Sequence, residues 1–359
     1  MRSVLDVLMA SRYSSDRPAD IGRESPVRSH HGTHRLPAVS SCPLPVSDSV
    51  QRPVPVTDPD HRPAPVTHGP DDVALVFESG GMRGAYTAGL VRVMLEAGLS
   101  FPWVGGISAG CTNTCNFASR DIWRTREAYL GLTTDPKAGG WGSFVTGKGY
   151  FNSEHIYLHT SAPDESIPFD WETFAASPTT VRLGAFRCDT GEEVYWGLED
   201  MPTMGDLLVR ARASSSMPVL MPMVEVDGAP YVDGAVGPTG GFAIDAARAD
   251  GYDKLLVVMT RPEGYRKPPM RRHEIEVLQR LYSRYPALVQ AVIDRPENYN
   301  RTVEELEDLR GQGLAYLFRP ERMPIANGEL RYDRIVTAFE AGLAQARREL
   351  PAIEAFLAS

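Results

Sequence analysis

The sequence predicts an α/β protein in which helices cover a mostly parallel sheet. From Asp72 onward a buried strand, a helix, a second strand and a second helix follow one another, an order typical of parallel sheets. Further short apolar runs follow later, and the segments after Pro262 combine helical apolar spacing with alternating charge. The 359 residues are 42% hydrophobic and 23% charged, which is enough for a substantial core.

The first elements of the predicted sheet end at glycines. Val73–Phe77 is an apolar run that stops at a glycine cluster, as expected of a buried strand. Ala85–Ala97 has a helical apolar pattern closed by Gly98. A second strand is predicted at Val104–Ile107, and a second helix begins at Ala109.

The rest of the chain supplies the other strands and a helical C-terminal region. Later strands are predicted at Val181–Phe186, Val194–Trp196, Val224–Val226, Tyr231–Val232, Lys254–Met259 and near Leu314–Phe318. Helices are predicted at Met204–Ala213, Glu274–Ile293, Thr302–Gln312 and Tyr332–Leu357. We therefore expect a sheet domain over 72–262 and a mainly helical region over 263–359 that packs on it.

Residues 1–71 differ from the rest of the chain. They are rich in proline, and Arg52–His61 and Arg62–Asp71 are a decapeptide repeated in tandem. Proline fixes φ and removes donors, so this tract favours extended segments over a packed core. We interpret it as a disordered leader; the alternative is a ligand for a proline-binding module.

Charge, cysteine content and hydropathy argue against several classes of protein. The net charge of −9 argues against nucleic acid as a partner. The four cysteines are too scattered for a disulfide framework, and Cys111 and Cys115 are interpreted as small buried side chains and not as a metal pair. The sequence contains no apolar run of the roughly 20 residues that a membrane span needs, and Asp6 interrupts any signal-like segment. We expect a cytoplasmic protein without metal or cofactor.

A serine stands on a predicted sharp turn. Gly106-Ile107-Ser108-Ala109-Gly110 matches the G-x-S-x-G pattern, in which a strand turns into a helix within one residue. The flanking Gly106 and Gly110 let the two elements approach closely. Ser108 would then lie at a helix N-terminus, where backbone N–H groups stabilise negative charge. The alternative is an ordinary strand-to-helix turn.

A glycine loop follows the first strand and opens the first helix. Glycines there expose N–H groups in a nest suited to an anion. Dinucleotide binding would need a glycine at Ser79 and an acidic residue after the next strand, and neither is present. We therefore expect an oxyanion hole in which Gly80, Gly81 and Met82 supply donors and Arg83 adds charge or locks the loop. A purely structural turn is the alternative.

A serine hydroxyl needs a base to accept its proton. After Ser108 the sequence offers only His155, His159 and His273 as histidines, and none has the context of a triad member. Asp233 follows a predicted strand and precedes small residues, so partial burial can raise its basicity. The alternative is a turn aspartate, since Asp-Gly is a common turn pair.

Together the three motifs resemble those of patatin-like phospholipases. That family has a glycine loop of the form D/E-G-G-G-x-R/K-G, a G-x-S-x-G nucleophile and a D-G-A/G base. These correspond here to Glu78–Gly84, Gly106–Gly110 and Asp233–Ala235, so Gly84 and Gly234 are motif glycines. The resemblance covers roughly 72–261 and departs only at Ser79, which replaces the first glycine of the loop.

The resemblance implies a three-layer α/β sandwich and a Ser108–Asp233 dyad that cleaves carboxylic esters of lipids through an acyl-enzyme. It implies no calcium, and the lipid substrate implies contact with a membrane surface. Ser214–Met223 could line an acyl channel, form a lid, or be a packed connector, and Gly139–Gly149 with Tyr150–Asn152 is a candidate substrate rim. The alternatives are a histidine-triad esterase and a non-catalytic lipid- or partner-binding protein.

Overall fold

The computed structural model describes residues 65–359. The predicted leader lies outside the described residues up to residue 64, and so does Cys42. Its last part, 65–71, is described, and His68 pairs with Leu99 in an isolated β-bridge, so the expectation of disorder is wrong for these residues. Eight strands form one sheet in the described part of the chain. Their bounds are β1 Val73–Phe77, β2 Trp103–Ile107, β3 Thr180–Arg187, β4 Glu193–Trp196, β5 Val224–Val226, β6 Ala229–Asp233, β7 Lys254–Val258 and β8 Ala315–Phe318.

The sheet is mixed but mostly parallel, as the sequence predicts. Its strand order is β5-β6-β3-β2-β1-β7-β8, and β4 pairs with β3 beside this path. The five strands from β3 to β8 in that order are parallel to one another, whereas β4 and β6 run antiparallel to β3. The carboxyl ends of β1, β2 and β7 therefore lie side by side at one edge, where ligands of parallel sheets bind.

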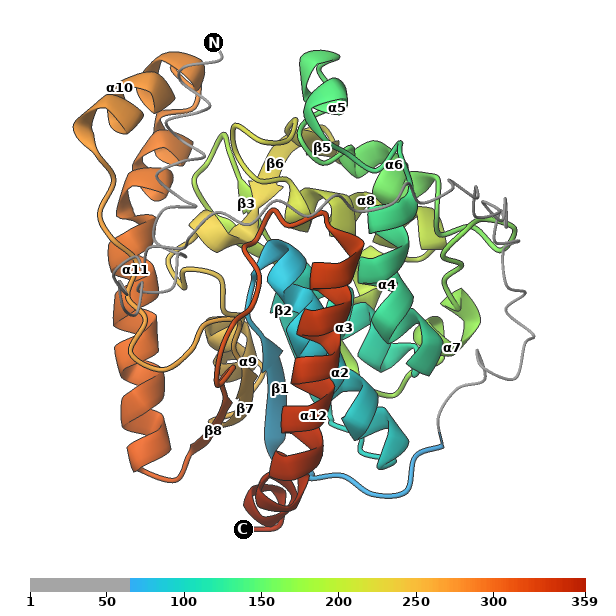
Figure 1. Cartoon of the computed structure of the whole chain (residues 1–359). Helices are drawn as coiled ribbons and strands as arrows, with labels where there is room; N and C mark the ends of the chain where they lie inside the picture. Colours follow the sequence, from blue (N-terminus) through green and yellow to red (C-terminus); the bar gives the residue numbers. More distant parts are fainter. Residues whose placement is uncertain (1–64) are drawn as a thin grey trace, which may run out of the picture. The chain divides into compact units, whose positions relative to one another are not determined.

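Helices cover both faces of this sheet (Figure 1). Their bounds are α2 Gly84–Glu96, α3 Ala109–Ala118, α4 Ile122–Thr134, α5 Trp141–Val145, α6 Ser153–Leu158, α7 Trp171–Ala175, α8 Met204–Ser215, α9 Ile244–Ala249, α10 Arg272–Leu281, α11 Pro286–Gly311 and α12 Tyr332–Leu357. Short 3-10 turns occur at η3 Gly81–Arg83, η4 Leu198–Asp200 and η5 Gly234–Val236.

Alternate residues of the central strands pack into different helical layers. In β1, Val73, Leu75 and Phe77 join a core with α2, α4 and α12. Ala74 and Val76 face the other way, into a core with α9 and α11. Successive side chains of a strand point to opposite faces, so a strand that is apolar throughout must be covered on both. The fold therefore has three layers, with the sheet between two layers of helices.

The helical C-terminal region packs directly on the sheet domain through α12 and α2 (Figure 1). A Cβ on Gly342 would lie 1.9 Å from the Tyr86 carbonyl oxygen, and one on Gly89 would lie 2.4 Å from the Leu343 nitrogen. Glycine on each helix therefore lets the two backbones touch. The boundary between the two regions at residue 262 stays a prediction.

The helix boundaries predicted after Pro262 are partly wrong. Glu274–Ile293 is not one helix: α10 ends at Leu281, and α11 begins at Pro286. Proline is favoured in the first turn of a helix, and Pro286 opens α11 after a short break. The predicted helix Thr302–Gln312 is the second half of α11, which continues through Pro296.

Candidate active site

Ser108 occupies a strained turn between β2 and α3. Its backbone has φ 60° and ψ −119°, in the region that L-residues rarely adopt. The Ser108 N–H donates to the Ser214 hydroxyl at 2.9 Å, and that hydroxyl donates to the Gly184 carbonyl oxygen at 2.6 Å. The turn is thus tied to β3, and the serine is held at the helix N-terminus as the motif predicts.

The motif glycines are required by close backbone contact. A Cβ on Gly106 would lie 2.4 Å from the Gly110 carbonyl, and one on Gly110 would lie 2.4 Å from the Phe77 oxygen. A Cβ on Gly84 would lie 2.3 Å from the Tyr129 hydroxyl, and Gly234 lies against Gly184. These glycines bring β1, β2 and α3 together around the serine.

Asp233 ends β6, and the Ser108 hydroxyl lies close enough to it to lower the pKa of its carboxyl group. Its Oδ1 accepts the Ala235 N–H at 2.8 Å. Both Ser108 and Asp233 are only 3% exposed, so water is largely excluded from the pair. Burial raises the pKa of Asp233, and the Ala235 N–H, the Ser108 hydroxyl and the cations Arg295 and Lys267 oppose this rise.

The glycine loop after β1 contains two candidate oxyanion donors, Gly80 and Gly81. Gly81 has φ 55° and lines the same pocket as Ser108. Within residues 65–359 no backbone acceptor is found for the N–H groups of Gly80 and Gly81. The prediction for Met82 needs correction, because its N–H already donates to the Asn327 carbonyl oxygen at 2.9 Å. Gly80 and Gly81 are the better candidates for an oxyanion hole.

Ser79 and Arg83 flank these donors. Ser79 has no positive φ, so a serine fits this position without backbone strain. Its N–H donates to the Gly241 oxygen at 2.9 Å, and its carbonyl accepts from the Thr260 hydroxyl at 3.0 Å. The Arg83 side chain is buried and does not line the pocket. Its charge lowers the pKa of Lys267 and of Tyr299. The charge of Arg83 is therefore directed toward Lys267 and Tyr299 and not into the pocket.

The three histidines after Ser108 do not line the pocket that contains it. His155 lies on α6, with its Nε2 2.6 Å from the Asp135 carboxylate, and its ring stacks on His159. His273 is exposed on α10. Among the described residues, Asp233 is therefore the base candidate that the fold brings to Ser108.

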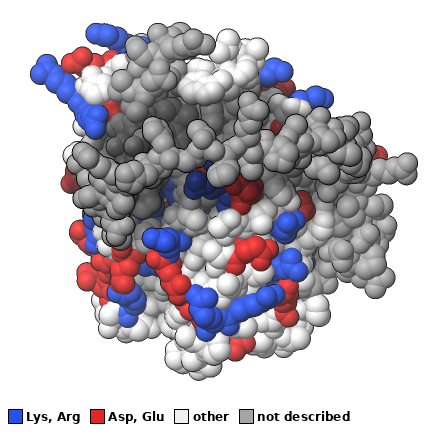
Figure 2. Space-filling model, in the orientation of Figure 1, with Lys and Arg blue, Asp and Glu red and all other residues white. Residues whose placement is uncertain are grey.

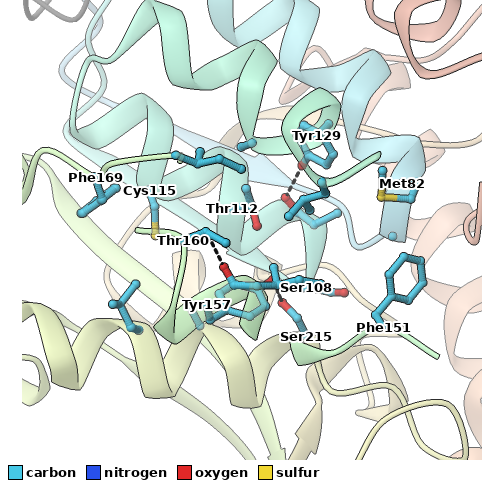
Figure 3. Close-up of a pocket in the computed structure, with 18 of the residues that line it drawn as sticks. Met82, Ser108, Thr112, Cys115, Tyr129, Phe151, Tyr157, Thr160, Phe169 and Ser215 are labelled. Carbon is cyan, nitrogen blue, oxygen red and sulfur yellow. Dashed lines mark hydrogen bonds between the residues drawn. The ribbon is translucent and has the colours of Figure 1, made fainter. Parts of the chain in front are cut away.

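A pocket opens beside Ser108. Figure 3 shows Met82 and Phe151 on one side of Ser108, and Cys115 and Phe169 on the other. Most of the lining is apolar, supplied by Ala128, Leu132, Ile156, Ile167, Leu207, Leu208 and Ala211. Arg124 is the one charged lining residue; its guanidinium lies 5.0 Å from the Phe169 ring centroid and donates to Asn116 at 2.7 Å. Such a pocket suits an acyl chain.

Two segments whose roles the sequence left undecided lie at this pocket. Met217 and Met221 line it, so Ser214–Met223 supplies part of the channel wall. Tyr150 donates its N–H to the Leu220 oxygen at 2.6 Å, which joins the candidate rim to that wall. Cys111 and Cys115 are free and buried, as expected, and Cys115 is part of the lining.

Sequence reasoning did not find Ser214 and Asn327. Ser214 lies in a run of three serines, 106 positions from Ser108, and nothing local marks it as the partner of the turn. Asn327 belongs to a loop before α12 whose carbonyl reaches the glycine loop. Both contacts depend on the tertiary fold and leave no spacing signal.

Gly81→Ala should lower kcat for a soluble p-nitrophenyl ester by about 100-fold, because a Cβ would strain φ 55° and lie 2.5 Å from the Asn327 oxygen. Losing an oxyanion donor costs on the order of 3 kcal/mol. Gly311→Ala is the control, since nothing lies within 4 Å of its Cβ position. A Gly81→Ala protein that folds and keeps kcat within twofold would remove this loop from the mechanism.

Two family models match parts of this chain. Residues 75–243 match the family model described as patatin-like phospholipase, and residues 285–358 match a model described as a domain of unknown function, DUF6363. Uncharacterized protein YjjU of Escherichia coli K12 is 27% identical over 195 residues, which are 54% of this chain and 53% of that relative. The match thus spans about half the length of the curated relative.

The crystal structure of VipD from Legionella pneumophila is a distant structural neighbour, with a TM-score of 0.43 and 10% identity over 79% of this chain and 67% of that one. The fold is an α/β sandwich of the patatin-like class with a helical C-terminal region. Over residues 75–243 the chain is therefore similar to the patatin-like phospholipase family.

The described residues contain no cluster of three histidine, cysteine or acidic side chains that could hold a metal ion. Over 65–359, no helix combines the length and the apolar composition needed to cross a lipid bilayer.

Proposed function

We propose that this protein hydrolyses carboxylic esters of lipids with a Ser108–Asp233 dyad and an acyl-enzyme intermediate. The observation that carries the proposal is the buried Asp233 carboxyl close to the hydroxyl of a strained Ser108, which lines an apolar pocket. A carboxyl group whose pKa is raised by burial is a stronger base than one in water.

In the first step, the Ser108 Oγ forms a bond to the ester carbonyl carbon and its proton passes to Asp233. The N–H groups of Gly80 and Gly81 stabilise the oxyanion. The bond to the alcohol then breaks, and the departing alcohol oxygen takes the proton from Asp233. In the second step, water gives a proton to Asp233 and attacks the acyl carbon. The bond from Ser108 to the acyl group then breaks, the fatty acid is released, and Asp233 returns the proton to the Ser108 oxygen.

The proposal is tested by incubating the purified protein with p-nitrophenyl butyrate and with phospholipid vesicles, and measuring nitrophenolate and released fatty acid. Turnover of either substrate supports an ester hydrolase. Lipid binding without any turnover would instead support the alternative of a non-catalytic lipid-binding protein.

We also propose that α5 contacts the lipid surface from which the substrate comes. Trp141 and Val145 are 50% and 77% exposed although they are large and apolar. Trp141 packs against Tyr150, which is joined to the pocket wall at Leu220. Lys148 is exposed beside them and suits anionic lipid. The helix lies at the same end of the sheet domain as α6 and β5 (Figure 1).

The double substitution Trp141→Ser and Val145→Ser should reduce hydrolysis of anionic vesicles about tenfold more than hydrolysis of a soluble short-chain ester, because less apolar surface enters the bilayer. Vesicle co-sedimentation measures the binding. Leu314→Ser, at a 37% exposed residue just before β8, is the control. Equal losses on both substrates would count against a lipid-docking role.

A further inference from the structure

One charged side chain lies in the wall of the largely apolar acyl pocket. Arg124 belongs to the first turn of α4, is only 9% exposed, and lines the same pocket as Ser108. A buried charge is unfavourable unless polar or charged groups surround it. An apolar side chain would suit a pocket that accepts only an alkyl chain, so the arginine calls for another explanation.

The surroundings of Arg124 differ from those of the charged side chains on the surface. On the face seen in Figure 2, acidic and basic side chains are interspersed wherever described residues are visible. The Arg124 guanidinium instead donates to two neutral oxygens, the Asn116 Oδ1 at 2.7 Å and the Ser161 Oγ at 3.3 Å. A guanidinium has more N–H donors than these two bonds use.

The Arg124 guanidinium retains the capacity to bind an anion. Its Nε is buried and has no hydrogen-bond partner among residues 65–359. Burial lowers the pKa of Arg124 more than the charge of the neighbouring Asp121 raises it. The Asp121 Oδ1 accepts the Arg124 backbone N–H at 2.8 Å. Because an arginine side chain stays charged in proteins, a further carboxylate at this cation would be favourable.

Arg124 lies in the part of the pocket that is away from the candidate nucleophile. Ser108 precedes α3 and Cys115 lies two turns into that helix, and both line the pocket. Asn116, the next residue, holds the Arg124 guanidinium. Figure 3 shows Cys115 and Phe169, which belong to one apolar cluster, on the same side of Ser108. The Arg124 guanidinium lies 5.0 Å from the centroid of that Phe169 ring.

The separation along α3 indicates a length for the acyl group. With a rise of about 1.5 Å per residue, Asn116 lies roughly 12 Å beyond Ser108 along the helix axis. An extended chain spans about 1.2 Å per bond, so roughly ten bonds would join an acyl carbon at Ser108 to a group at the guanidinium. A medium-length acyl chain would therefore end beside Arg124, where a plain alkyl end would leave the cation without an anionic partner.

We propose that Arg124 binds a carboxylate at the far end of the acyl group, so that the preferred substrates are esters of medium-chain dicarboxylic acids. This rests on the proposed ester hydrolase function and specifies the acyl part of its substrate. The planar fork of a guanidinium matches the oxygens of a carboxylate, and hydrogen bonds between ions are stronger than neutral ones. The same chemistry would accept the carboxylate of a free fatty acid that enters in the reversed direction, and the experiment separates these two sources.

The experiment compares the mono-p-nitrophenyl ester of decanedioic acid with its methyl ester, which has the same chain without the charge. Wild-type kcat/KM should be at least tenfold higher for the free acid. Arg124→Met keeps an apolar stem over Phe169 and removes the cation, so it should abolish this preference. Arg124→Lys should retain part of it, because an ammonium attracts a carboxylate but lacks the fork.

Arg126→Met is the matched control on the same helix. Arg126 pairs with Glu127, is 31% exposed and does not line the pocket, so its loss should leave the ratio of the two rates unchanged. The rate for p-nitrophenyl butyrate, whose chain is too short to reach the guanidinium, separates a specificity role from a structural one. Arg124→Met should lower this rate far less than the rate for the free acid. Equal losses on all three esters would overturn the proposal.

A chain-length series provides a readout that needs no variant. In the wild-type protein, the preference for the free acid over its methyl ester should be largest near decanedioic acid. It should be small for hexanedioic acid, whose far carboxylate cannot reach Arg124. A preference that is absent, or that does not depend on chain length, overturns the site even if Arg124→Met fails to fold.

The last arm tests the source of the carboxylate, with decanedioate and decanoate as competitors of p-nitrophenyl butyrate hydrolysis. Stronger competition by decanedioate, lost in Arg124→Met, supports the proposal. Equal competition by decanoate, together with no preference between the two decanedioic esters, assigns the site to free fatty acid and overturns the substrate assignment. If the wild-type protein hydrolyses none of these esters, the proposed function itself fails, and calorimetry with decanedioate and decanoate still tests the carboxylate site.

Discussion

Ser108→Ala should abolish ester hydrolysis, lowering kcat by on the order of 10⁴-fold or more, because no other nucleophile stands on the strained turn facing Asp233. The assay is nitrophenolate release from p-nitrophenyl butyrate, followed by fatty acid release from phospholipid. The alanine should fold normally, since the contact that fixes the turn is made by the Ser108 backbone N–H and not by its hydroxyl.

Ser283→Ala is the matched control, because Ser283 is exposed in the turn between α10 and α11. It should keep full activity. If Ser108→Ala retains the wild-type rate in the same preparation, the nucleophile assignment is wrong, and hydrolysis must come from another site.

Asp233→Asn should lower kcat by about 10³-fold or more, because an amide cannot take the proton of Ser108. General bases contribute on the order of 10² to 10⁴. Asparagine is nearly isosteric and can still accept the Ala235 N–H, so the end of β6 should be preserved. Kinetics with p-nitrophenyl butyrate and a thermal melt of each protein provide the measurement.

His155→Gln and His273→Gln distinguish the dyad from a histidine triad. Neither residue lines the pocket with Ser108, and His155 is held by Asp135. Both variants should keep activity within about threefold. Loss of activity in His273→Gln together with an active Asp233→Asn would favour the triad esterase instead.

Much of the sheet could be predicted because its strands are short apolar runs that end at glycines. Val73–Phe77 and Val104–Ile107 lie in the middle of the sheet and are buried on both faces, so every position is apolar or small. The meeting of the glycine loop and Ser108 follows from that pattern, because carboxyl ends of adjacent parallel strands share one edge.

The position of Asp233 was harder to derive from physical pattern alone. It ends β6, which pairs antiparallel with β3, and no local spacing indicates that this edge of the sheet brings the carboxylate to Ser108. The motif resemblance, and not the periodicity, supplied that pairing. The bond from Met82 to Asn327 was likewise out of reach, because the two residues meet only when the loop before α12 returns to the glycine loop.

The break between α10 and α11 could have been found from the sequence. Pro286 lies inside the predicted helix Glu274–Ile293, and an interior proline removes one backbone hydrogen bond and clashes with the preceding turn.

The central claim is that Ser108 becomes acylated, and covalent labelling tests it most directly. A fluorophosphonate probe reacts with an activated serine hydroxyl and leaves a stable adduct that peptide mass spectrometry can assign to one residue. The dyad predicts a single adduct on the peptide that contains Ser108, strongly reduced in Asp233→Asn and absent in Ser108→Ala. An adduct on a different residue, or an unlabelled wild-type protein that still hydrolyses esters, would contradict it.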